Sequence, residues 1–176
     1  ASLDAGADRG AFFRPEIGDE VVVGFINSDP RHAVVLGMLN SSAKPAPITA
    51  QDDNHEKGFT TRSGMRLHFN DDTNTITIDT PAGNSLQLDE QGTKIEINDQ
   101  NSNKITLDTA GITLDSPNNV EIKAGVNLTL SAAASLSIGG ATLSVNADGS
   151  VGIEGAATKL SAQGITEISG SLVKIN

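Results

Sequence analysis

The 176-residue sequence contains no cysteine, no tryptophan and no tyrosine. Without cysteine, the chain has neither a disulfide framework nor a thiolate metal site. Its only aromatic residues are five phenylalanines, 3% of the chain. A globular core of this size usually contains more large rings. The 18 glycines and many aliphatic residues instead favour a narrow interior filled by β-branched and small side chains.

Basic residues are also scarce, because 12 Lys and Arg face 22 Asp and Glu, which gives a net charge of −10. Nucleic acids and anionic membranes are negatively charged, so we expect no nucleic-acid partner. No run approaches the roughly 20 apolar residues that a membrane helix needs. No segment has a convincing 3.6-residue period, and we therefore expect an all-β chain.

The N-terminal part predicts a β-hairpin over residues 15–40. The apolar runs Val21–Ile26 and Ala33–Leu39 are separated by Asn27-Ser28-Asp29-Pro30, a sequence rich in turn formers. Residues 40–60 are polar and contain two prolines at 45 and 47, which predicts a linker or an ordered surface loop.

From about Met65 the chain alternates strictly: Met65, Leu67 and Phe69 point one way, and the residues between them point the other. Aliphatic pairs at i and i+2 then recur about every eight residues, with turn formers between them. We predict that these pairs form a core ladder: Ile76 and Ile78, Leu86 and Leu88, Ile95 and Ile97, Ile105 and Leu107, Ile112 and Leu114, Val120 and Ile122, Leu128 and Leu130, Leu136 and Ile138, Leu143 and Val145, Val151 and Ile153.

Each repeat has only about two inward aliphatic residues, so one strand is not stable alone and many must stack over a shared interior. Two geometries fit this pattern. One chain can wind around itself with three repeats per coil. Alternatively, three identical chains can wind together, with strands from all three on each face. The periodicity does not choose between the two arrangements.

A family resemblance favours the second geometry. The segment Pro15-Glu16-Ile17-Gly18-Asp19-Glu20-Val21, the later Asp29-Pro30 and the strand Val34-Val35-Leu36-Gly37 resemble the end of the OB-fold domain of VgrG proteins. The segment Gly58–Asp71 resembles that family's entry into its β-helix. The repeats are also similar to the central spike of contractile phages. The resemblance implies the end of an OB-fold barrel (1–42), a linker or neck (43–64) and an intertwined trimeric triple-stranded β-helix (65–176). We expect the chain to be a C-terminal fragment.

What the resemblance implies for function is a structural, membrane-piercing spike at the tip of a contractile injection tube. The expected partners are two further copies in a homotrimer, a PAAR-type tip protein, effectors, and the tube protein and baseplate through an N-terminal base. Contact with the target membrane would be transient. Such a spike assembles in the bacterial cytoplasm and is then delivered to the target cell envelope. The residues that we expect to dock the tip protein are Leu172, Val173, Lys174, Ile175 and Asn176.

The sequence offers no catalytic set, so we predict that the protein is not an enzyme and has no cofactor. It contains no phosphate loop, nucleophile elbow or zincin motif. His32, His55 and His68 are far apart, and we predict no metal site. The alternative hypothesis is a cell-surface carbohydrate-binding β-helix resembling phage tailspikes, but the lack of Trp and Tyr counts against it.

Overall fold

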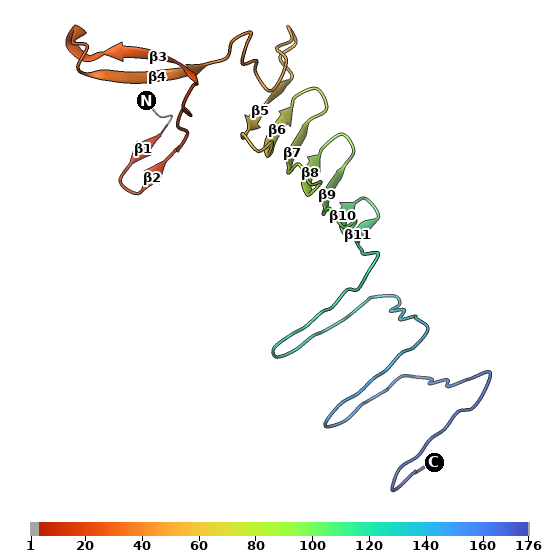
Figure 1. Cartoon of the computed structure of the whole chain (residues 1–176). Coiled ribbons are helices and arrows are strands. Elements are labelled where there is room, and N and C mark those ends of the chain that lie inside the picture. Colours follow the sequence, from red (N-terminus) through yellow and green to blue (C-terminus); the bar gives the residue numbers. More distant parts are fainter. Residues whose placement is uncertain (1–3, 176) are drawn as a thin grey trace. The chain divides into compact units, whose positions relative to one another are not determined.

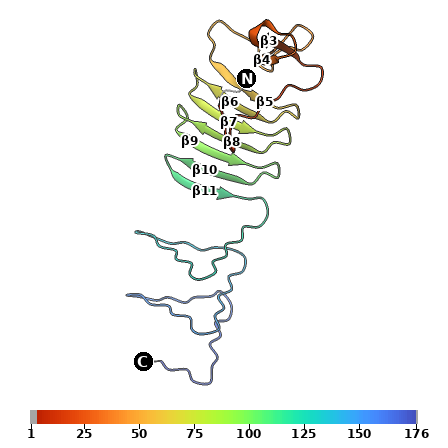
Figure 2. The same ribbon diagram turned by 90° about the vertical axis from the view of Figure 1, so that its left-hand side faces the viewer.

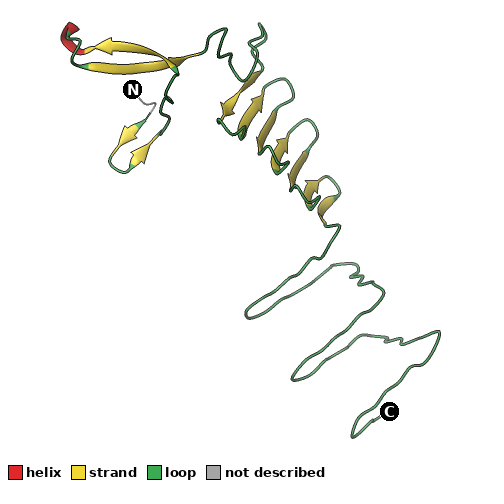
Figure 3. Cartoon of the chain, in the orientation of Figure 1, coloured by secondary structure: helices red, strands yellow, loops and turns green. Residues whose placement is uncertain are grey.

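The computed structural model describes residues 4–175, and this part of the chain is all-β apart from one short 3₁₀ turn. Within the same residues, no helix is long and apolar enough to cross a membrane. The chain divides into two units, residues 1–122 and 123–176. All strands of the described residues belong to the first unit. Figure 3 accordingly draws the second unit as loop.

The N-terminal part contains two antiparallel hairpins. The short strands β1 (Ala5–Gly6) and β2 (Arg9–Gly10) form one, and β3 (Glu20–Phe25) and β4 (Ala33–Leu39) form the other. The second hairpin confirms the predicted strand pair. Its connection begins with a 3₁₀ turn, η1 (Ile26–Ser28).

The next seven strands form one antiparallel sheet in which each strand pairs with its neighbours in the sequence. Figure 1 shows this meander in yellow to green, and Figure 2 shows it turned by 90°. The strands are β5 (Glu56–Thr60), β6 (Arg66–Asn70), β7 (Thr75–Asp79), β8 (Ser85–Asp89), β9 (Lys94–Asn98), β10 (Lys104–Asp108) and β11 (Gly111–Asp115).

The strand register keeps the aliphatic pairs in phase across the sheet. Ile76 pairs with Leu88, and Ile78 pairs with Leu86. The same match recurs at every later strand pair, up to β10 and β11. A slip of one residue would turn a whole strand's aliphatic residues to the opposite face, so this pattern strongly specifies the register.

The loops alternate between two types. Five-residue loops begin at residues 61, 80 and 99, a regular spacing of 19 residues, and their fourth residues are Gly64, Gly83 and Ser102. All three of these residues have positive φ, and the loops share one backbone hydrogen-bond pattern. The four-residue loops 71–74 and 90–93 also end on residues with positive φ, Asn74 and Thr93. The structural repeat of this part is thus a two-strand unit of 19 residues.

The sheet differs in two respects from the expected β-helix. It begins with β5, which lies inside the segment 43–64 that the sequence predicted as a linker or neck. In residues 56–115, moreover, neighbouring strands belong to the same chain, whereas intertwining places strands of different copies side by side. Over residues 56–115 the sheet is thus formed within one chain and is not intertwined.

Candidate assembly surface

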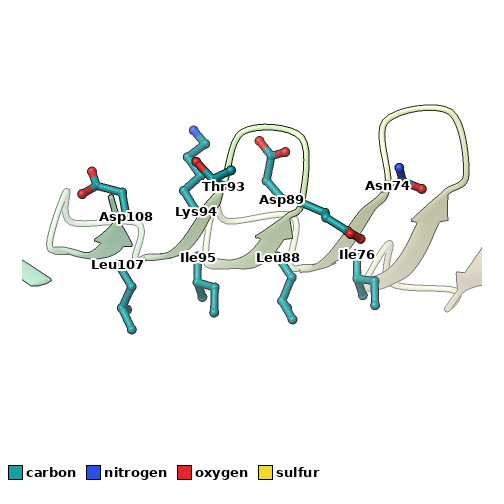
Figure 4. Close-up of a pocket in the computed structure, with 10 residues that line it drawn as sticks. Asn74, Ile76, Leu88, Asp89, Thr93, Lys94, Ile95, Leu107 and Asp108 are labelled. Atoms are coloured by element: carbon teal, nitrogen blue, oxygen red, sulfur yellow. The ribbon is translucent and has the colours of Figure 1, made fainter. Parts of the chain in front are cut away.

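One face of the seven-stranded sheet is lined by two parallel rows of apolar side chains. Figure 4 shows part of the first row, where Ile76, Leu88, Ile95 and Leu107 project to one side of the strands. Charged and polar residues of the same segment, such as Lys94, project to the other side. The second row contains Phe59, Leu67, Ile78, Leu86, Ile97, Ile105 and Leu114. We call this surface, formed by both rows, the apolar face.

The apolar face is not covered within one chain. None of the described residues is buried, and Ile95 in the middle of the sheet is still 37% exposed. The open groove along the first row has a volume of about 500 Å³. At the last strand the exposure is higher, and Ile112 reaches 70%. A contiguous apolar surface of this kind marks an interaction site.

The opposite face of the sheet is polar and contains ion pairs between strands. Arg66 Nη2 lies 3.0 Å from Asp79 Oδ2, across the β6–β7 pair. Glu96 lies between two lysines: Lys94 Nζ is 2.8 Å from one carboxylate oxygen, and Lys104 contacts the other. The contrast between the two faces indicates which one belongs in water.

Glu96 is a largely covered charge of the polar face and has two cationic partners. Its side chain is only 12% exposed. Hydrogen bonds from Lys104 and then Lys94 lower the pKa of the Glu96 carboxyl, since both cations favour its charged form. In turn, Glu96 raises the pKa of Lys94. The three side chains tie β9 to β10 by charge as well as by backbone hydrogen bonds.

Contacts that the sequence analysis missed join the N-terminal part to the start of the sheet. The rings of Phe13 and Phe59 stack with their centroids 5.5 Å apart. Arg62 Nη1 lies 2.7 Å from Glu16 Oε2. These residues are 46 positions apart in sequence, and no local pattern indicates such a pairing. The one signal for this contact in the sequence was the small number of aromatic residues: the chain has five phenylalanines, and two of them meet here.

The predicted ladder residues fall into two groups. Those from Ile76 to Leu114 lie on β7 to β11 and form most of the apolar face. Those from Val120 to Ile153 lie outside any strand and are more than half exposed. The structure brings the first group together and leaves the second apart.

The remaining predicted residues form no cluster. Leu172, Val173, Lys174 and Ile175 lie in an exposed loop, and Asn176 lies outside the described residues. His68 shares the polar row of the sheet with Thr77. In the part of the chain that the structure describes, no group of three or more His, Cys, Asp or Glu side chains could hold a metal ion.

Comparison with known protein families gives a match at the N-terminal end of the chain. Residues 1–39 match the family model of the type VI secretion system/phage-baseplate injector OB domain. The N-terminal segment is therefore similar to this OB domain, which supports a spike-related role in a phage baseplate or a type VI secretion system. This similarity implies that the protein is a component of a secreted injection apparatus. No curated protein matches the chain.

Proposed function

We propose that the chain forms the shaft of a homotrimeric, VgrG-type spike at the tip of a contractile injection tube. The observation that carries this proposal is the uncovered apolar face beside a segment similar to an injector OB domain. A sheet with one wet and one apolar face is stable only when the apolar face packs against something. Three copies that turn this face inward would enclose one narrow aliphatic interior.

Mechanical strength follows from this arrangement. Burying one aliphatic side chain contributes about 1.5–3 kcal/mol, and each chain places two of them on almost every strand. To bend or open the shaft, many strands from three chains would have to separate together. A stiff, thin object of this kind concentrates force at its end and pierces the envelope of a target cell without catalysis or a cofactor.

The proposed role as a spike also implies partners at both ends of the chain. The N-terminal OB-like segment faces the baseplate and the tube protein. At the other end, Leu172–Asn176 docks a PAAR-type tip protein, and effectors are carried on the spike. Leu172 and Ile175 are each more than 80% exposed, as an apolar docking end requires. The spike assembles in the bacterial cytoplasm and reaches the target envelope when the machine contracts.

The test of this proposal is the mass in solution, measured by light scattering coupled to size exclusion. The expected mass is three times 18.1 kDa, with early elution for that mass. A compact 18.1 kDa monomer, or a dimer made by two apolar faces, would overturn the trimeric spike. Leu172→Asp and Ile175→Asp should keep the trimeric mass and reduce the binding of a PAAR-type protein.

A further inference from the structure

One edge of the sheet carries a series of half-buried polar residues. Asn84 is the last residue of the loop 80–84, Asn103 is the last residue of the loop 99–103, and Ser116 directly follows β11. The central residues of both loops are exposed, whereas these three are not. Polar groups that are partly withdrawn from water need hydrogen-bond partners, so the bonds of these residues show which segments they hold together.

The Asn84 amide joins its own loop to the next one along this edge. Its Nδ2 donates to Thr80 Oγ1 at 3.1 Å, at the start of the same loop. Its Oδ1 accepts from the backbone N–H of Gln100 at 3.2 Å, 16 positions further along the chain. One side chain thus spans two loops that are separated in sequence by two strands.

Asn103 repeats this arrangement one unit later. Its Nδ2 donates to Asp99 Oδ2 at 2.7 Å, again at the start of its own loop, and its Oδ1 accepts from Ser116 Oγ at 2.5 Å. Ser116 Oγ in turn accepts from the backbone N–H of Asn118 at 3.2 Å. A hydroxyl has one proton to donate and lone pairs to accept, so both bonds form at once. The hydrogen bonds therefore continue from the sheet onto the segment that follows it.

The exception at the first loop follows the same chemistry. Met65 holds the position that the two asparagines hold in their loops. The next loop has Pro81 at the position equivalent to Gln100, and proline has no backbone N–H to donate. A Cβ placed on Gly64 would lie 3.2 Å from Pro81 Cγ, so these two loops meet through the proline ring instead. Asparagine thus stands where the next segment offers a donor and is replaced where the next loop offers none.

We propose that Asn84, Asn103 and Ser116 form a hydrogen-bond relay that makes the segments of this edge open together rather than one at a time. Opening the loop 99–103 breaks the bond from Gln100 to Asn84 and the bond from Ser116 to Asn103. Each asparagine then keeps a half-buried carbonyl oxygen without a donor, which opposes the opening. The relay is a tie along the length of the sheet. It does not rest on the proposed trimer, because every bond lies within one chain.

Hydrogen exchange of the folded full chain, followed by mass spectrometry of peptides, tests the relay. The test variant is Asn103→Ala, and the readout is the exchange of residues 116–119. The matched control is Asn101→Ala in the same loop. Asn101 also donates to Asp99 Oδ2, at 3.3 Å, but among the described residues its side chain has no hydrogen bond beyond its own loop.

Asn103→Ala should speed the exchange of residues 116–119 by about 2- to 10-fold, the effect of losing one hydrogen bond. Asn101→Ala should leave that exchange unchanged. An equal effect of the two changes on residues 116–119, or an effect of Asn103→Ala confined to its own loop, would overturn the relay.

Two further variants separate a relay from isolated bonds. Asn84→Ala should speed exchange in the loop 99–103 and also in residues 116–119, to which Asn84 has no direct bond among the described residues. An effect that stops at the loop 99–103 would mean that the two asparagines act separately. Ser116→Ala should speed exchange in the loop 99–103, and it decides the question if far-UV circular dichroism shows that Asn103→Ala unfolds the sheet. Unchanged exchange of that loop in Ser116→Ala contradicts the proposal.

Discussion

At the scale of single residues, the identity of each ladder position matters only if another copy covers it. Ile97 is 44% exposed in one chain. In an uncovered sheet, a polar residue there would cost little. In a closed shaft the same position is dry, and an amide without a partner is expensive.

Ile97→Asn is therefore expected to destabilise the assembled protein strongly. The lost aliphatic burial costs about 1.5–3 kcal/mol per chain, and the unpaired amide costs about 1–3 kcal/mol more. Urea denaturation followed by circular dichroism measures the change. Thr77→Asn, on the polar face, should stay within about 0.5 kcal/mol of the natural protein. Equal effects of the two changes would mean that the apolar face remains open.

The stability of the folded protein should depend on pH through the Glu96 carboxylate. Because Lys104 and Lys94 lower its pKa in the folded state, the stabilisation is present above the unfolded pKa of about 4.3 and disappears as pH falls through the folded value. Glu96→Gln should therefore lower the urea midpoint at pH 7, and the difference from the natural protein should shrink below about pH 4. Lys104→Gln should produce most of the same loss. A pH-independent difference would argue against this role of the ion pairs.

At the scale of elements, the five-residue loops form a matched set. Gly64 and Gly83 adopt φ values of 84° and 98°, which favour glycine, whereas Ser102 occupies the equivalent position with φ 68°. The serine side chain therefore stands in a backbone conformation that L residues adopt at a cost of roughly 1–2 kcal/mol.

Exchanging the two residue types gives a reciprocal prediction. Ser102→Gly should stabilise the protein by about 0.5–1 kcal/mol, and Gly83→Ser should destabilise it by about 1 kcal/mol. Thermal melting followed by circular dichroism measures both changes. If both changes shifted the stability in the same direction, the two loops would not be equivalent. The conformational entropy of the unfolded chain, which is larger with glycine than with serine, reduces the size of both effects.

Sequence patterns predicted the elements unequally well. Strict alternation of apolar and polar residues predicted β6 to β11, because aliphatic residues two positions apart lie on the same face of a strand. β5 was missed because Glu56-Lys57-Gly58-Phe59-Thr60 has only one large apolar residue, and its strand state depends on pairing with β6. The reversal of the chain at each loop was also missed, because loops of four or five residues fit a corner as well as a hairpin.

At the scale of the whole molecule, stability should depend on protein concentration. If three chains unfold together, a tenfold dilution removes about two thirds of 1.4 kcal/mol per chain, roughly 0.9 kcal/mol. The melting midpoint should then fall by about 2–4 °C for a chain of this size. Differential scanning calorimetry at two concentrations measures the shift, and equal midpoints at two scan rates provide the control. A midpoint that does not change with dilution would contradict unfolding coupled to dissociation.

The 19-residue unit has a consequence for how such a sheet changes length. Each unit adds two strands, which lengthens the sheet by about 9.6 Å at 4.8 Å per strand. After these two strands, the chain is again on the same side of the sheet and runs in the same direction. Duplicating or deleting one unit thus keeps the chain exit where it was. Losing a single strand would send the chain out on the opposite side. The sheet can therefore change its length only by whole units, and insertions or deletions among natural variants should come in multiples of 19 residues.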